Sequence, residues 1–319
     1  MANEIKVSIL CLAYNHGKYI RKTLEGFVSQ KTDFEYEVIV HDDASTDDTA
    51  RIIREYAEKY SFIRPIYQTK NQYSQNVSIL PTFMNSLVRG TYIAFCEGDD
   101  YWTDVTKLQK QVDYMDANPD CSMCCHAYEK IRASDEVVLE IVNTLVGEQD
   151  LTPEQAILYH NPSQIATQMF RTEVVTQMPE LFYGTDVGDY PLMLRAVSCG
   201  RIHYLPDNMA AYRVAAAGSW TERVYRDDNK QRHHWDLMIG LLQRFDEHSN
   251  YRFHSAVEKR LDEINFHYAL IDGDYKAMKR CHAFHNLPAY RKGIICVGCF
   301  APGLAKGIDH LINKLKGRD

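Results

Sequence analysis

Three continuous apolar segments near the N-terminus constrain the fold most strongly. They are KVSILCLAY (6–14), YEVIVHDD (36–43) and TYIAFCEGDD (91–100), and each ends in polar residues. Apolar runs without alternation are typical of strands buried on both faces of a parallel sheet. Helical periods separate these runs, and the shorter run FIRPIY (62–67) adds a strand. The pattern predicts βαβ crossovers and a doubly wound α/β sheet.

The downstream part of the chain has a different pattern. Short strand-like and helical segments alternate up to about residue 218, and the chain then becomes mainly helical. We expect one domain over residues 1–218, with a mixed sheet, and a helical C-terminal region over residues 219–319. The C-terminal region is a candidate for contact with a partner molecule or a membrane, because an apolar stretch (293–305) precedes a basic amphipathic segment. Packing against the first domain is the alternative.

Composition restricts the partners and the compartment. A formal net charge of −7 argues against a nucleic-acid partner, because phosphate binding needs an excess of Lys and Arg. The N-terminus enters a strand without a signal-peptide pattern, so we expect a cytoplasmic protein.

The nine cysteines lie mostly in apolar runs, which favours buried thiols over disulfides. Two CxxC pairs leave a zinc site as a minor alternative: Cys121 with Cys124, and Cys296 with Cys299.

Polar clusters follow three of the predicted strands. They are YNHGK (14–18), HDDASTDDT (41–49) and EGDDYW (97–102). In doubly wound sheets the ligand lies at the carboxyl ends of the strands, so these clusters predict a binding site at one sheet edge. Ordinary solvated loops are the competing interpretation. Neither GxGxxG nor a phosphate loop occurs, so a bound nucleotide would depend on carboxylates and an aromatic side chain.

The second and third clusters carry candidate ligand-binding carboxylates. Ser45 and Asp48 are interpreted as an N-cap and capping-box pair, which leaves Asp42 and Asp43 unexplained. In an extended segment Glu97 and Asp99 would point to the same side. Two converging carboxylates repel unless a cation lies between them, and hard oxygen ligands select Mg²⁺ or Mn²⁺. The sequence therefore predicts a divalent metal site here.

Five segments in order resemble the family 2 inverting glycosyltransferases of GT-A fold. They are VSILCLAYNHGKYIRKTLEGFVSQ, EVIVHDDASTDDT, GTYIAFCEGDDYW, DYPLMLRAV and YRVAAAGS, within residues 5–218. The resemblance implies a nucleotide-sugar donor, a divalent metal (Mn²⁺ or Mg²⁺) at Asp99, and Asp189 as the catalytic base. It also implies donor-binding roles for Tyr14, Asn15, Asp42, Asp43, Glu97, Asp99, Asp100 and Trp102.

Within that set, the resemblance implies more specific roles. Tyr14 and Asp43 would hold the base, while Asp100 and Trp102 would shape the sugar and acceptor side. Asp189 also fits a helix N-cap, and Asp186 is its nearest competitor as base.

The chain departs from the family pattern at two places. Glu97 stands where the family's first motif acid is Asp, so Asp99 is the safer metal ligand. Relatives often carry a His after the Tyr-Arg pair, whereas Tyr212 and Arg213 are followed by VAAAGS.

The predicted function is metal-dependent, inverting transfer of a sugar from a UDP- or GDP-type donor. The acceptor would be a glycan or a lipid-linked molecule in polysaccharide or cell-surface glycan synthesis. A nucleotidyltransferase and a non-catalytic sugar-nucleotide-binding module are the alternatives. The protein would be cytoplasmic, with peripheral membrane contact through its C-terminal tail as a further option.

Overall fold

The computed structural model describes residues 4–75, 77–143, 145–158, 163–214, 220–301 and 303. The chain divides into two compact units. The first comprises Met1–Tyr183 and Val187–Glu222, and the second comprises Gly184–Asp186 and Arg223–Asp319. All of the predicted donor-binding and catalytic residues lie in the first unit. The amphipathic tail after residue 303 lies outside the described residues, and the expected domain ranges of 1–218 and 219–319 stay a prediction.

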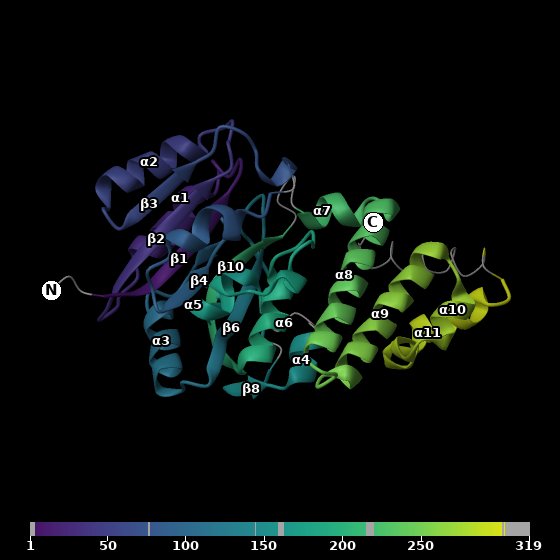
Figure 1. Cartoon of the computed structure of the whole chain (residues 1–319). Helices are drawn as coiled ribbons and strands as arrows, with labels where there is room; N and C mark the ends of the chain where they lie inside the picture. The colour runs from purple at the N-terminus through teal and green to yellow at the C-terminus, as the bar shows by residue number, and fades with distance from the viewer. Residues whose placement is uncertain are drawn as a thin grey trace. The chain divides into compact units, whose positions relative to one another are not determined.

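The first unit is built on one mixed sheet, whose first strands run side by side in Figure 1. Its strands are β1 (Ile5–Ala13), β2 (Glu35–Asp42), β3 (Ile63–Tyr67), β4 (Tyr92–Phe95), β5 (Tyr101–Trp102), β6 (Cys121–Arg132), β7 (Val138–Val142), β8 (Gln149–Leu151), β9 (Met169–Arg171) and β10 (Arg201–Val214). The main order is β3-β2-β1-β4-β9-β6-β10-β5, while β7 pairs with β6 and β8 with β10.

Strand direction follows the sequence pattern. The continuous apolar runs form the parallel set β3-β2-β1-β4, as predicted. In β1 the central residues Val7 to Cys11 are buried on both faces, which explains the absence of alternation. Strand β9 is antiparallel to both of its neighbours, so the sheet is mixed. The carboxyl ends of β1, β2 and β4 therefore meet at one edge.

Helices connect these strands. In the first unit they are α1 (Ile20–Val28), α2 (Thr49–Lys59), α3 (Lys107–Ala117), α4 (Pro153–Leu158), α5 (Thr172–Thr176) and α6 (Asp189–Cys199), and α7 (Trp220–Tyr225) follows β10. Helix α1 buries Ile20, Leu24 and Phe27 completely, at the i, i+4 and i+7 spacing of one helix face. The periodic segment at 80–88 forms only short π and 3₁₀ turns instead of the expected helix.

The second unit is helical. Its helices are α8 (Asp228–His248), α9 (His254–Asp272), α10 (Tyr275–Arg280) and α11 (Ala289–Gly298). The expected helical character of this region is confirmed, and α9 and α10 are joined at DGD (272–274): Gly273 ends α9 in the left-handed conformation, and the Asp274 side chain caps α10. Within the described residues, every helix is too short or too polar to cross a membrane.

Candidate active site

The acidic segment after β4 forms a tight turn. The amide of Asp100 donates to the Glu97 carbonyl oxygen at 3.1 Å, and the Gly98 amide donates to the Leu12 carbonyl oxygen of β1 at 2.9 Å. A Cβ atom at position 98 would lie only 2.8 Å from Nδ1 of His16. Because a larger residue would force His16 or the turn to shift, Gly98 allows the turn to lie against the end of β1.

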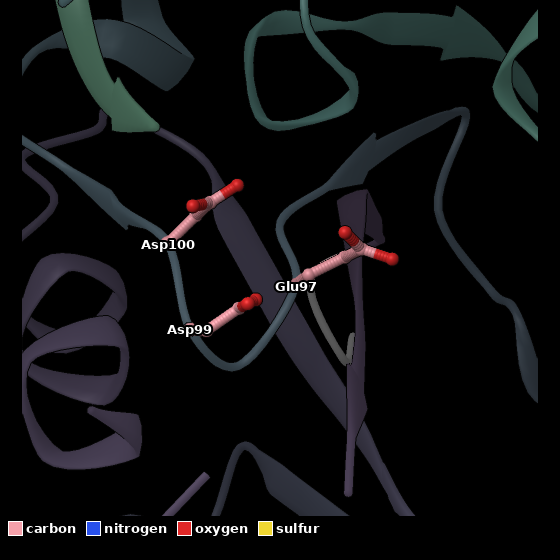
Figure 2. Close-up of side chains that lie close together, drawn as sticks. All are labelled: Glu97, Asp99 and Asp100. Carbon is pink, nitrogen blue, oxygen red and sulfur yellow. The ribbon is translucent and has the colours of Figure 1, made fainter. Parts of the chain in front are cut away.

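This turn gathers three carboxylates, which Figure 2 shows on one short loop. One carboxylate oxygen from each of Glu97, Asp99 and Asp100 lies within 4.8 Å of the other two. The expectation of an extended segment was wrong, because the i to i+3 hydrogen bond makes residues 97–100 a turn. The predicted convergence of Glu97 and Asp99 is nevertheless confirmed, and the turn adds Asp100 to the group.

Crowding and burial change the acidity of this cluster. The Glu97 side chain is open to solvent on one side, but the surrounding protein desolvates it and raises its pKa to about 8. Repulsion from Asp99 and Asp189 adds to this shift. Burial and the Asp99 charge likewise raise the pKa of Asp100 well above its ordinary value. A divalent cation between these oxygens would remove the repulsion that causes part of both shifts.

The buried Asp100 side chain shows that the cluster fits such a cation. Its Oδ1 accepts a hydrogen bond from the Arg213 amide at 2.8 Å. Its Oδ2 is buried and finds no hydrogen-bond partner within the described residues. A buried carboxylate oxygen without a donor is costly, and hard oxygen donors are the ligands that Mg²⁺ and Mn²⁺ prefer. Glu97, Asp99 and Asp100 could therefore hold one divalent ion together.

Tyr14 and Asp43 lie at the same sheet edge. Tyr14 follows β1 and is 45% exposed, whereas Asp42 and Asp43 at the end of β2 are both buried. The Asp43 amide donates to the Ala13 carbonyl oxygen at 2.9 Å, which fixes the two strand ends side by side. One oxygen of Asp42, Oδ1, is buried without a partner among the described residues. These positions place an exposed aromatic ring beside buried acidic groups.

Asp43 has an additional role that the sequence did not indicate. Its Oδ1 accepts from the Gln72 amide at 2.7 Å, and its Oδ2 accepts from the Tyr73 amide at 3.0 Å. The carboxylate thereby anchors the segment that follows β3 and carries the half-exposed Tyr73. Both oxygens of this buried carboxylate therefore already accept hydrogen bonds within the protein.

Asn15 and Ser45 connect the loops after β1 and β2. The Asn15 amide donates to Ser45 Oγ at 2.9 Å, and the Asn15 Oδ1 accepts from the Thr46 amide at 2.8 Å. The capping-box interpretation of Ser45 and Asp48 was wrong. Helix α2 starts at Thr49, its N-cap Asp48 makes no side-chain cap bond, and the Ser45 hydroxyl is used by Asn15 instead. Asn15 therefore acts as a loop connector.

Trp102 lies in the core next to the acidic turn, and its side chain is only 4% exposed. Its Nε1 donates to the Ala166 carbonyl oxygen at 2.8 Å, and its ring packs edge-on against Phe27 at 4.9 Å. A large indole with its polar atom satisfied in this way supports the turn by packing. The role that the resemblance implies for Trp102, shaping the sugar and acceptor side, stays a prediction.

Asp189 is the first residue of α6. Its N-cap is Gly188, so the N-cap interpretation of Asp189 was wrong, and the Asp189 Oδ1 accepts from the Tyr190 amide at 2.8 Å. The Asp189 carboxylate lies close enough to Glu97 to raise the pKa of that residue. The competing carboxylate is engaged elsewhere, since Asp186 Oδ1 lies 2.8 Å from Nδ1 of His234.

His16 is a site residue that the sequence reasoning missed. Its Nε2 lies 3.9 Å from the Asp99 Oδ2, and its buried Nδ1 has no hydrogen-bond partner among the residues with a described position. The available signal was its place in YNHGK, directly after β1 at the edge where the acids gather.

The minor zinc alternative gains no support: in the described ranges, only the acidic cluster has three or more potential ligand atoms in mutual proximity.

The chain is similar in sequence to proteins of one known family. The sequence pattern of the family described as "Glycosyl transferase family 2" matches residues 8–171. An uncharacterised protein of Mycobacterium tuberculosis, Rv1520, is 38% identical over 227 residues, which are 70% of this chain and 63% of that protein. The glucosyltransferase WfaP of Escherichia coli is 36% identical over 110 residues, 34% of this chain and 41% of WfaP. The chain thus spans less than two thirds of the length of these curated relatives.

Solved structures share the fold at low identity. Staphylococcus aureus TarS (residues 1–349), solved with UDP-GlcNAc, matches with a TM-score of 0.61 and 19% identity over 92% of this chain and 80% of TarS. The mannosyltransferase PcManGT of Pyrobaculum calidifontis, solved with GDP-Man and Mn²⁺, matches with a TM-score of 0.52 and 16% identity over 98% of this chain and 89% of that one. Fold and family agree with the mixed α/β GT-A architecture expected from the sequence.

Proposed function

The chain belongs to glycosyl transferase family 2, and from this membership we propose that it transfers one sugar, with inversion, from a UDP- or GDP-linked donor. The acceptor is a hydroxyl group of a glycan or a lipid-linked molecule in cell-surface glycan synthesis. The titles of similar proteins support the donor class, since TarS was solved with UDP-GlcNAc and PcManGT with GDP-Man. The name of WfaP supports the acceptor class, because it gives a lipid-linked sugar, alpha-D-GlcNAc-diphosphoundecaprenol, as the acceptor of glucose from UDP-Glc.

The observation that carries the proposal is the meeting of two carboxylate groups from distant segments. Glu97, Asp99 and Asp100 gather their oxygens within 4.8 Å. Asp189, from the start of α6, lies near enough to raise the pKa of Glu97. A cation-binding cluster beside a separate carboxylate is what metal-assisted transfer to a hydroxyl group needs: one part binds the diphosphate and the other accepts a proton.

In the proposed reaction Asp189 is the general base. It takes the proton of the acceptor hydroxyl as that oxygen bonds to the anomeric carbon from the face opposite the diphosphate. The bond between the anomeric carbon and the diphosphate oxygen breaks, and its electron pair leaves with the nucleoside diphosphate. A divalent ion held by the acidic cluster would supply charge neutralisation for that leaving group. No covalent sugar–enzyme bond is required.

Donor recognition is assigned to the edge formed by β1 and β2. The exposed ring of Tyr14 offers a stacking surface for the base, as aromatic side chains do in other nucleotide sites. Asp43 accepts hydrogen bonds from base N–H groups through its free lone pairs. In this proposal Asp42, next to Asp43, assists through its partnerless buried oxygen, and Asn15 acts indirectly by fixing the loop beyond Tyr14.

The test compares Asp189→Asn with Asp186→Asn. Asparagine keeps the shape of the side chain but cannot accept a proton, so transfer by Asp189→Asn should fall by about 10²–10⁴-fold. Donor binding, measured by calorimetry, should stay within about twofold. Asp186→Asn keeps an acceptor for His234 and should retain most of the activity. Transfer by Asp189→Asn within a few-fold of wild type would remove Asp189 from the mechanism.

A donor panel separates the other enzyme classes. UDP- and GDP-sugars are incubated with Mn²⁺, and slow release of nucleoside diphosphate without acceptor is expected. A nucleotidyltransferase would instead release pyrophosphate from a nucleoside triphosphate and a sugar phosphate. A non-catalytic module would bind the donor and release nothing.

A further inference from the structure

A buried arginine lies directly behind the acidic turn. The side chain of Arg213, near the end of β10, is 1% exposed. Its Nε donates to the Asp99 carbonyl oxygen at 2.8 Å, and its backbone amide donates to Asp100 Oδ1 at 2.8 Å. Its guanidinium also lies over the ring of Tyr19 at 4.4 Å. Arg213 therefore fixes both the backbone and one side chain of the turn that carries the carboxylate cluster.

The charge of Arg213 is balanced by a residue far away in sequence. A buried guanidinium is costly unless an anion is paired with it. Within the described residues this anion is Glu136, whose Oε1 accepts from Nη2 of Arg213 at 2.9 Å. Asp99 offers Arg213 only its backbone carbonyl oxygen, and Asp100 receives only the backbone amide. The carboxylates of both aspartates therefore remain directed to the cluster.

The position of Glu136 is itself unusual. Glu136 lies in the turn between β6 and β7 with φ of 58°, a left-handed conformation that disfavours non-glycine residues. The turn is closed by the Glu136 amide, which donates to the Arg132 carbonyl oxygen at 2.9 Å. The second carboxylate oxygen of Glu136 pairs with Lys22 of α1, whose ammonium group covers the Tyr101 ring at 4.0 Å. The carboxylate thus connects the turn to α1 and β10.

We propose that Glu136 is a positioning residue for the acidic cluster. By holding and neutralising Arg213, it keeps that cation from pairing with the carboxylates of Asp99 and Asp100, which stay available to a divalent ion. Loss of the Glu136 charge leaves an uncompensated guanidinium beside the cluster, where it competes with the metal. This inference rests on the proposed metal-dependent function, and it assigns to the β6–β7 turn a role in metal binding.

The test uses the full chain and Glu136→Gln, which keeps the side-chain length and removes the charge. The matched control is Glu140→Gln on the same hairpin, where the exposed Glu140 pairs only with Lys130 at 3.0 Å among the described contacts. Mn²⁺ affinity is measured by calorimetry. We expect the Mn²⁺ Kd to rise at least fivefold in Glu136→Gln and to stay within twofold of wild type in Glu140→Gln.

A second readout does not depend on metal. Hydrogen exchange of the peptide covering residues 96–103, in EDTA, should be at least threefold faster in Glu136→Gln than in the control. Faster exchange in a protein whose wild type binds no Mn²⁺ would refute the proposed metal site but support the positioning role. Unchanged Mn²⁺ Kd together with unchanged exchange would refute the positioning role.

A second variant guards against a simple folding defect. Glu136→Gly removes the carboxylate and also relieves the left-handed strain, so its fold should be retained. It should weaken Mn²⁺ binding in the same direction as Glu136→Gln. If Glu136→Gly melts cooperatively and binds Mn²⁺ like wild type, the proposal is wrong. If neither variant folds, Glu136 is a structural residue and the proposal is equally wrong.

Discussion

The acidic cluster should make the metal-free protein less stable than a variant lacking one of its charges. Asp99→Asn removes the central carboxylate with little change of shape. At the 4.8 Å that bounds the separation of the three oxygens, two unit charges repel by about 3.5 kcal/mol at an effective dielectric constant of about 20. Solvent reaches Glu97 and Asp99, and protonation of the neighbours relieves part of the repulsion, so about 1–2 kcal/mol remains.

Thermal unfolding in EDTA measures this gain. The first unfolding midpoint of Asp99→Asn should rise by about 2–6 °C, from the usual shift per kcal/mol in chains of comparable size. Saturating Mn²⁺ should then have opposite effects on the two proteins. Wild type gains about 2.7 kcal/mol at a metal concentration of about 100 times Kd, whereas Asp99→Asn gains little. In EDTA the unfolding midpoint of Asp99→Asn should therefore be the higher one, and in saturating Mn²⁺ that of wild type.

The matched control is Asp113→Asn on the exposed face of α3, where Gln109 is the one side chain that donates to the lost carboxylate among the described contacts. This control should keep both the wild-type midpoint and the wild-type response to Mn²⁺. The reasoning would be refuted if Asp99→Asn in EDTA were no more stable than Asp113→Asn, or if it kept the full Mn²⁺-dependent rise.

Three further changes test the fold around the site. Burial alone would raise the pKa of Glu37, but hydrogen bonds, chiefly from Arg89, hold it below its usual value. Glu37→Gln should therefore destabilise the protein by about 2–3 kcal/mol, as expected for hydrogen bonds to a charged group. This contribution is present above about pH 4.3 and is lost as pH falls through the lower folded-state pKa, which urea unfolding of both proteins between pH 3 and 7 would show. Burial lowers the pKa of Lys107 to about 7. Above pH 7 the free energy of unfolding of wild type should therefore rise, relative to that of Lys107→Met, by up to about 1.4 kcal/mol per pH unit. Urea unfolding at pH 7–9 measures this, and an equal pH dependence of the two proteins would contradict it. Gly98→Ala places a Cβ 2.8 Å from His16 Nδ1, so either His16 or the acidic turn must shift. Because both lie at the acidic cluster, we expect Mn²⁺ binding to weaken by at least about tenfold in calorimetry, and unchanged affinity would contradict this.

The sheet was predictable because its signal is local. Burial of both faces leaves a continuous apolar run in the sequence, and β1, β2 and β4 each carry one. Prediction failed where long-range pairing decides the structure. The sequence indicated only that short strand-like and helical segments alternate up to about residue 218. In the structure Ile165–Thr167 forms a 3₁₀ turn before the three-residue β9, and pairing with β6 and β5 extends β10 to Val214.

The candidate site was predictable to the level of the strand ends. Parallel strands bring their carboxyl ends to one edge, so the meeting of Tyr14, Asp43 and the acidic turn follows from topology. The direction of single side chains does not follow from it. The Trp102 side chain lies in the core, where its indole N–H donates to the Ala166 carbonyl oxygen, 64 residues later. No local pattern around Trp102 encodes that partner.

The sequence alone also does not decide whether Asp186 or Asp189 is the catalytic base. The two carboxylates are three positions apart before one helix, and the sequence offers each a plausible role as base. Their partners distinguish them: Asp186 lies against His234, whereas Asp189 acts electrostatically on Glu97. In the proposed reaction the base is the carboxylate beside the acidic cluster, whereas the other one is held by His234. Residues distant in sequence from both aspartates therefore distinguish the two positions, and Asp189 as the base stays our proposal.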